Sequence, residues 1–220
     1  TFYKINPAAV PADNGHTYQT RPGYSQKFKG FEVSATKRMS NNWMARVAFS
    51  TSAHREYFDS LAAMGDPTPS PSSPNMNGGL VVRQTSGSGK SSIYMVLPKY
   101  QFIANAAYQL KWGITTGINY LFRDGYSEPF FRSRVATGDV LSGNKTVFVL
   151  GGVDWYKLPS VHSFDMRIGK EQKIDKVTLN FDIDLFNALN VATILGKQYD
   201  LRLSTAGQVL EIMNPRIIRF

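Results

Sequence analysis

One stretch of the sequence alternates strictly between apolar and polar side chains, and this pattern limits what the chain can form. From Val177 to Leu185, the five odd-numbered residues are apolar and the four even-numbered residues are polar. Successive side chains of a β-strand point to opposite faces, whereas a helix would mix the two sets on one surface. The stretch is therefore predicted to be a strand with one apolar and one polar face.

Five more segments show the same alternation, and a further strand is expected to begin at Arg216. These segments span residues 31–39, 43–50, 100–110, 112–122 and 164–169. The expected strands are roughly nine to eleven residues long, which is the length that a tilted crossing of a bilayer requires. Strands of soluble proteins average about five to six residues. The lengths therefore favour a membrane-spanning sheet.

The connections between the expected strands alternate between short and long. Short polar turns are expected at 40–42, 111–113 and 173–176, and long connections at about 52–99, 123–162 and 186–215. Structureless loops longer than about 15 residues are uncommon in compact soluble domains. Short turns at one end and long loops at the other are typical of outer-membrane barrels. The Pro- and Ser-rich part of the first long loop, 66–74, is expected to be exposed and mobile.

Aromatic side chains at the segment ends match the thickness of a bilayer. Trp112 and Phe122 lie ten residues apart on one apolar face, which at ~3.3 Å per residue and a tilt of ~40° spans about 25 Å along the membrane normal. Trp43 begins its segment beside a short turn, as Trp112 does. All three are predicted to be membrane-interface aromatics. The predicted fold is all-β: an antiparallel up-and-down transmembrane β-barrel, of which residues 1–220 form about six to seven strands.

The polar faces of the last two expected strands carry paired charges that are predicted to face the barrel lumen. The residues concerned are Asp165, Arg167, Asn180, Asp182 and Asp184. Paired carboxylates can perform acid–base chemistry, but a wet lumen also accommodates them as solvated or cross-strand charges. No nucleophile motif accompanies them. They are predicted to be wall residues, and the chain is not expected to be an enzyme.

Four aromatic residues of the long connections are candidates for contact with a ligand: Tyr57, Phe58, Trp155 and Tyr156. Rings of this kind can stack on a sugar or a chelate. Girdle packing or packing within the loops is the alternative role for the same residues.

Several other chemistries have little support in the sequence. The chain has no cysteine, which excludes disulfides and thiolate ligands. His16, His54 and His162 lie far apart in the sequence without a metal-ligand spacing. The stretch 87–91 is similar to a phosphate loop, but Gln84 occupies the position where that loop needs glycine. Neither a metal nor a cofactor is expected.

The chain is basic, with 25 Lys+Arg against 16 Asp+Glu and a formal net charge of +9. The basic residues are spread over turns, loops and strand ends rather than clustered, which argues against a nucleic-acid partner. Anionic lipid head groups and lipopolysaccharide are the expected partners of this charge.

Four segments resemble those of TonB-dependent outer-membrane receptors, and are most similar to the Oar-like group with a carboxypeptidase-regulatory-like N-terminal domain. They are residues 28–38, residues 158–170, the Leu-Phe-Asn-Ala-Leu-Asn run ending at Asn190, and Asn214–Phe220. The resemblance implies that residues 1–220 are the C-terminal part of a barrel of about 22 strands. It also implies location in the outer membrane of a Gram-negative bacterium. A plug and an energy-coupling box, both outside this chain, would admit a nutrient through the TonB complex.

Two other functions are compatible with the alternation. A soluble extracellular β-sandwich used for adhesion or glycan binding also has alternating strands, and a passive porin would share the barrel but lack a plug.

The chain begins at Thr1 without a signal-peptide pattern, and strand-type residues run up to Phe220. It is therefore expected to be part of a longer polypeptide, cut inside a strand.

Overall fold

The computed structural model describes residues 2–4, 6–9, 20–64, 68–70, 77–81, 98–140 and 142–220. No α-helix occurs among them. Three short 3-10 turns are present, η1 Pro7–Ala9, η2 Ala62–Met64 and η3 Lys111–Gly113. No helix in the described part of the chain has the length and apolar character needed to cross a membrane. The all-β prediction is confirmed.

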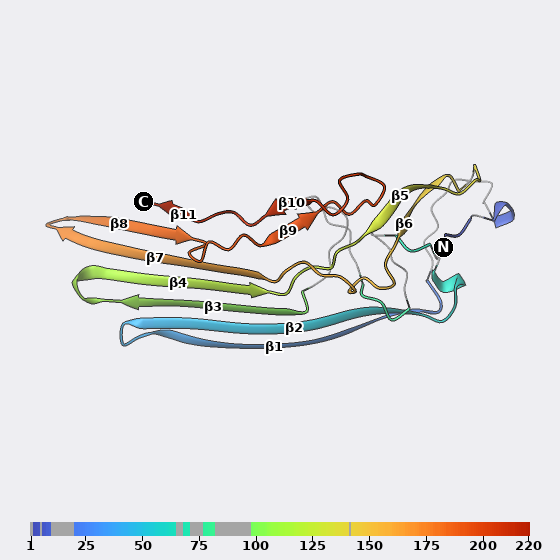
Figure 1. Ribbon diagram of the computed structural model, residues 1–220. Helices are drawn as coiled ribbons and strands as arrows, with labels where there is room; N and C mark the ends of the chain where they lie inside the picture. The colour runs from blue at the N-terminus through green and yellow to red at the C-terminus, as the bar shows by residue number, and fades with distance from the viewer. Residues whose placement is uncertain are drawn as a thin grey trace.

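A single antiparallel sheet of seven strands dominates the structure (Figure 1). In spatial order the strands are β1 (Tyr24–Ser40), β2 (Trp43–Phe58), β3 (Tyr100–Gln109), β4 (Ile114–Arg123), β7 (Val161–Ile174), β8 (Val177–Phe186) and β11 (Ile217–Arg219). Figure 1 shows the short turns at one end of the sheet and the long connections gathered at the other. The strands β1 and β11 form the two edges, so the described residues make an open sheet rather than a closed barrel.

The register of the sheet places apolar side chains beside apolar side chains. In a central row, Ala104 of β3 lies between Val47 of β2 and Tyr120 of β4. Exposure of Val33 in β1 is 51% and that of Phe181 in β8 is 61%, so no second layer covers these strands in the described part of the chain. A continuous apolar face therefore runs across the sheet and lies opposite a largely polar one.

The turn expected at 111–113 is present, but it changes the place of one aromatic residue. Trp112 was predicted to lie on a strand face, and this is wrong: β4 begins at Ile114 and Trp112 lies in η3 with a φ of 63°. The N–H of Leu110 donates to the carbonyl of Ile114 at 2.8 Å, and this bond closes the turn that contains Trp112. Trp112 is 81% exposed as a result.

The long connections contain strands of their own, which the alternation pattern did not predict. One contains the hairpin of β5 (Phe131–Ala136) and β6 (Asn144–Phe148), and another contains β9 (Ile194–Lys197) and β10 (Val209–Ile212). A parallel bridge between Phe131 and Asp200 joins them. We call the two hairpins with segments 124–130 and 149–160 the loop-end assembly. The six buried apolar residues of the described chain lie in it or close to the ends of β1 and β2: Phe58, Ala63, Phe148, Val153, Leu158 and Tyr199.

The Pro- and Ser-rich stretch also differs from the expectation where it is described. Thr68 is only 5% exposed, and its hydroxyl accepts a hydrogen bond from the N–H of Tyr3 at 2.7 Å. The carbonyl of Pro69 accepts a bond from the N–H of Phe148 at 2.7 Å. Residues 68–70 are therefore packed against the loop-end assembly. The rest of 66–74 lies outside the described residues.

The Asn-Ala-Leu-Asn run after β8 forms a turn that brings the last strand back to the sheet. Asn187 has a φ of 46°, and its side-chain oxygen accepts a bond from the Val191 N–H at 3.1 Å. Its amide group donates to the carbonyls of Val191 at 3.0 Å and Asn214 at 2.7 Å. The side chain of Asn190 accepts a bond from the Arg216 N–H at 3.0 Å. These bonds position the chain to enter β11.

Replacing Asn187 with alanine is expected to reduce the free energy of unfolding by about 2 kcal/mol, because it leaves buried backbone groups without partners. Asn187 is itself 5% exposed, so water cannot easily replace the amide. The comparison is Asn180→Ala, which alters an exposed amide on β8. Urea unfolding in detergent micelles measures both, and equal losses for the two variants would contradict this role.

Candidate functional site

The polar face of the sheet carries a three-strand ion-pair network centred on Asp184. Arg167 of β7 binds both carboxylate oxygens of Asp184, at 2.5 Å through Nε and 2.9 Å through Nη2. Arg219 of β11 binds Oδ2 through Nε at 3.0 Å and Nη2 at 2.5 Å. The carboxylate side chain is 8% exposed, whereas the two arginines are 52% and 62% exposed. The network ties the last strand to its neighbours and leaves both guanidinium groups accessible from the polar side.

The other residues predicted for this face lie on it as well. Asp165 accepts a bond from the side-chain amide of Asn119 at 3.2 Å and from the N–H of Asn187 at 2.9 Å. Asn180 and Asp182 continue the face toward the turn end of β8, where both are exposed. The structure thus places all five residues on one face and adds Arg219, which the sequence pattern did not single out.

The predicted interface aromatics lie at the two ends of the apolar face. Trp43 begins β2 beside the Asn41–Asn42 turn, at the same end as Trp112, and the ammonium group of Lys37 lies 4.0 Å from its ring centroid. Phe122 lies near the opposite end of β4, with its ring 5.1 Å from that of His162. Several other rings cluster around Phe122 in the half of the face nearest the loops: Phe49, Tyr100, Phe102, Tyr120 and Phe164.

The predicted ligand-contacting aromatics do not form one site. Tyr57 and Phe58 end β2 rather than lying in a loop. Phe58 is 6% exposed, packs 5.2 Å from the ring of Tyr24, and cannot present its face to a ligand. Trp155 and Tyr156 are 67% and 53% exposed. Within the described chain, no ring contact joins the first pair to the second.

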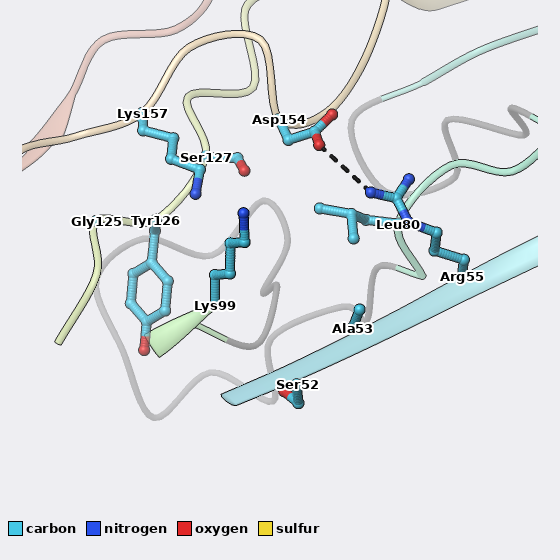
Figure 2. A pocket seen from close by; sticks show the side chains of 10 residues that line it. All are labelled: Ser52, Ala53, Arg55, Leu80, Lys99, Gly125, Tyr126, Ser127, Asp154 and Lys157. Carbon is cyan, nitrogen blue, oxygen red and sulfur yellow. Dashed lines mark ion pairs between the residues drawn. The ribbon is translucent and has the colours of Figure 1, made fainter. Parts of the chain in front are cut away.

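A cavity of about 250 Å³ lies where β2 meets the loop-end assembly (Figure 2). Its wall combines the end of β2 with Leu80, Lys99, residues 125–127, Asp154 and Lys157. Arg55 forms an ion pair with Asp154 at 3.7 Å, and Lys157 forms one with Asp124 at 2.7 Å. The wall draws on segments that are far apart in the sequence, so no local motif could have indicated it.

A close backbone contact holds one side of this cavity. The N–H of Leu158 donates to the Tyr126 carbonyl at 2.8 Å, and the N–H of Glu128 donates to the Tyr156 carbonyl at 2.8 Å. Gly125 lies so near Leu158 that a Cβ at this position would overlap the Leu158 carbonyl oxygen. The carboxylate of Glu128, 7% exposed, pairs with Lys197 at 2.7 Å. Segments 124–128 and 156–158 are thus tied to each other and to β9.

Asp200 ties the two hairpins of the loop-end assembly together and makes this part of the protein sensitive to acid. Its carboxylate accepts bonds from the Ser133 hydroxyl at 2.6 Å and from the Arg202 N–H at 3.0 Å. Burial raises the pKa of Asp200, but these hydrogen bonds lower it by more, so the pKa lies below its ordinary value. A depressed folded-state pKa stabilises the fold above the unfolded pKa, and this contribution is lost as the pH falls through the folded pKa.

Stability of the loop-end assembly is accordingly expected to fall below about pH 4 in a manner that depends on Asp200. Asp200→Asn should lower stability at pH 7 and flatten the change between pH 7 and pH 3. Hydrogen exchange of β5 and β9 amides at both pH values measures this effect. Identical pH profiles for the variant and the unaltered protein would contradict the assignment.

Among the residues that the structure describes, no three His, Asp or Glu side chains gather in a way that could hold a metal ion. His54 contacts Gln26 at 2.9 Å and His162 contacts the Tyr120 hydroxyl at 2.9 Å. His16, the 87–91 stretch and Gln84 lie outside the described residues.

No family model, curated protein or solved structure matches the chain. A functional assignment therefore depends on the residues and geometry above.

Proposed function

We propose that the seven-stranded sheet is a section of an outer-membrane β-barrel wall, and that the barrel belongs to a TonB-dependent transporter or receptor. The observation that carries the proposal is the apolar face, which continues across the sheet and is not covered by any of the residues that the structure describes. Phe181, Ile183 and Ile118 on this face are 61%, 49% and 41% exposed. Large contiguous apolar surfaces of this kind are rare on soluble monomers and mark contact with lipid or protein.

Three further features support a membrane setting. The opposite face carries ion pairs and amides, as a water-filled lumen requires. Aromatic rings lie at both ends of the apolar face, where the bilayer meets water. All the long connections and their packed hairpins lie at one end, which corresponds to the extracellular loops of such barrels (Figure 1). In this setting the basic side chains near the loop end face anionic head groups and lipopolysaccharide.

In the proposed protein, this chain supplies wall and extracellular loops and performs no chemistry. The energy-dependent part of the proposal rests on the resemblance of the sequence: an N-terminal plug and the TonB complex would admit a small nutrient through the lumen. A full-length polypeptide without a plug sequence would favour a passive porin instead.

Dependence on detergent tests the membrane proposal against a soluble β-sandwich. The full-length protein that contains this chain should fold and remain monodisperse in detergent micelles and should aggregate when the detergent is removed. It should also float with phospholipid vesicles in a density gradient and resist alkaline extraction. A folded, monodisperse monomer in plain buffer would contradict the proposal.

A further inference from the structure

The cavity beside β2 contains more positive than negative charge. Of the described residues that line it, Arg55, Lys99 and Lys157 are cationic, and Asp154 carries the one carboxylate. Asp124 pairs with Lys157 from outside the wall. Three positive charges thus face two negative charges, and one positive charge remains unbalanced. Like charges that share a small space favour an anion between them.

Lys99 accounts for this surplus. In the described part of the chain no carboxylate pairs with its ammonium group, which lies 5.2 Å from the centroid of the Tyr100 ring. Figure 2 shows the ammonium groups of Lys99 and Lys157 pointing toward each other from opposite walls. The two groups come from segments 58 positions apart in the sequence, so local chain geometry does not force them together.

A hydroxyl group lines the same space. Ser127 is 7% exposed, and its hydroxyl has no hydrogen-bond partner among the described residues. The hydroxyl is therefore available to donate to a group bound in the cavity. In the view of Figure 2, the Ser127 oxygen is drawn near the ends of the two lysines. An antiparallel bridge joins Ser127 to Lys157 and places the two residues side by side.

We infer that this cavity binds an anion of the phosphate class, held by Lys99, Lys157 and the Ser127 hydroxyl. The donors approach from different directions, which suits a tetrahedral oxyanion with acceptor oxygens on all sides. A planar carboxylate is better matched by the two parallel N–H groups of a guanidinium, and the one guanidinium among the described lining residues, that of Arg55, already pairs with Asp154. The same chemistry occurs in free phosphate compounds and in lipid head groups. The inference does not depend on where the sheet resides.

Calorimetric titration of the protein in neutral detergent with inorganic phosphate tests the site. Lys99→Gln is expected to weaken binding about tenfold, because it removes one charged donor, the ammonium group that lies 5.2 Å from the centroid of the Tyr100 ring. Ser127→Ala removes only the hydroxyl and should also weaken binding. Lys176→Gln makes the same charge change as Lys99→Gln in the exposed turn after β7, and it should have no effect.

A second arm identifies the source of the anion. Vesicles of phosphatidylcholine with and without phosphatidic acid are compared for binding of the same variants. Binding of free phosphate that is lost in Lys99→Gln supports a soluble phosphate compound. Selective binding to phosphatidic acid that is lost in the same variant supports a lipid head group. The inference is overturned if the unaltered protein recognises neither probe, or if Lys99→Gln and Lys176→Gln behave alike while near-ultraviolet circular dichroism shows both folded.

Discussion

Val47→Arg is expected to reduce the free energy of folding into lipid vesicles by about 2–4 kcal/mol, because it places a charge near the middle of the bilayer. Val47 lies in β2, halfway along the apolar face, and pairs with Ala35 on one side and Ala104 on the other. It is 40% exposed. The loss therefore cannot arise from overpacking in a protein core. Urea titration of the vesicle-bound protein measures it.

The adjacent residue of the same strand provides the matched control. Ala48 points to the polar face, where its strand partners are Ser34 and Ile103. Ala48→Arg introduces the same side chain at the same depth on the side proposed to face water, so its cost should stay below about 1 kcal/mol. If the two arginines cost the same, or if Ala48→Arg costs more, the assignment of the two faces is wrong.

Gly125→Ala is expected to separate the two segments that form one wall of the cavity. The new Cβ would overlap the Leu158 carbonyl oxygen, so the backbone must move rather than a flexible side chain. Overpacking of this kind costs about 3 kcal/mol. Hydrogen exchange of the Leu158 and Glu128 amides, which now bond across this contact, should become much faster. The expected result is a locally opened loop end above an intact sheet.

Gly196 offers a comparison in the same assembly. A Cβ there would lie 3.8 Å from the Glu211 Cβ, which is an ordinary contact. Gly196→Ala should therefore leave exchange near Leu158 unchanged. Equal exchange in the two variants would mean that the contact of Gly125 with Leu158 does not hold the wall in place.

The sheet was predictable because the alternation that defines each strand lies within a short, continuous stretch of sequence. Each strand repeats one alternation, and a register shift of one residue would move its apolar side chains to the wrong face. The faces of β8 and β4 could therefore be read from the sequence, along with the turn at Asn41–Asn42. The ends of strands were less predictable: β1 has 17 residues and extends well beyond its alternating core.

The loop end was not predictable because its contacts join distant segments. Phe58 looked like an exposed loop aromatic, but Tyr24 and Arg21 pack against its ring only after the chain has folded back. The bridge between Phe131 and Asp200 spans 69 positions, and no periodic pattern marks either end. Trp112 was misplaced for a different reason: its spacing fits the strand, but a three-residue turn ends just after it. The role of Arg219 could not be predicted from the sequence, because it depends on the pairing of β11 with β8.

The central claim is that the odd-numbered residues of β8 lie against lipid while the even-numbered ones lie against water. Because the chain contains no cysteine, a spin label can be attached at single positions from 178 to 183 in vesicle-bound protein. Collision rates with oxygen, which concentrates in lipid, and with a water-soluble nickel chelate should then alternate with a period of two residues. Oxygen should dominate at Leu179, Phe181 and Ile183, and nickel at the residues between them. Shielding of those three positions from both reagents, as in a sheet packed under a second protein layer, would contradict the account.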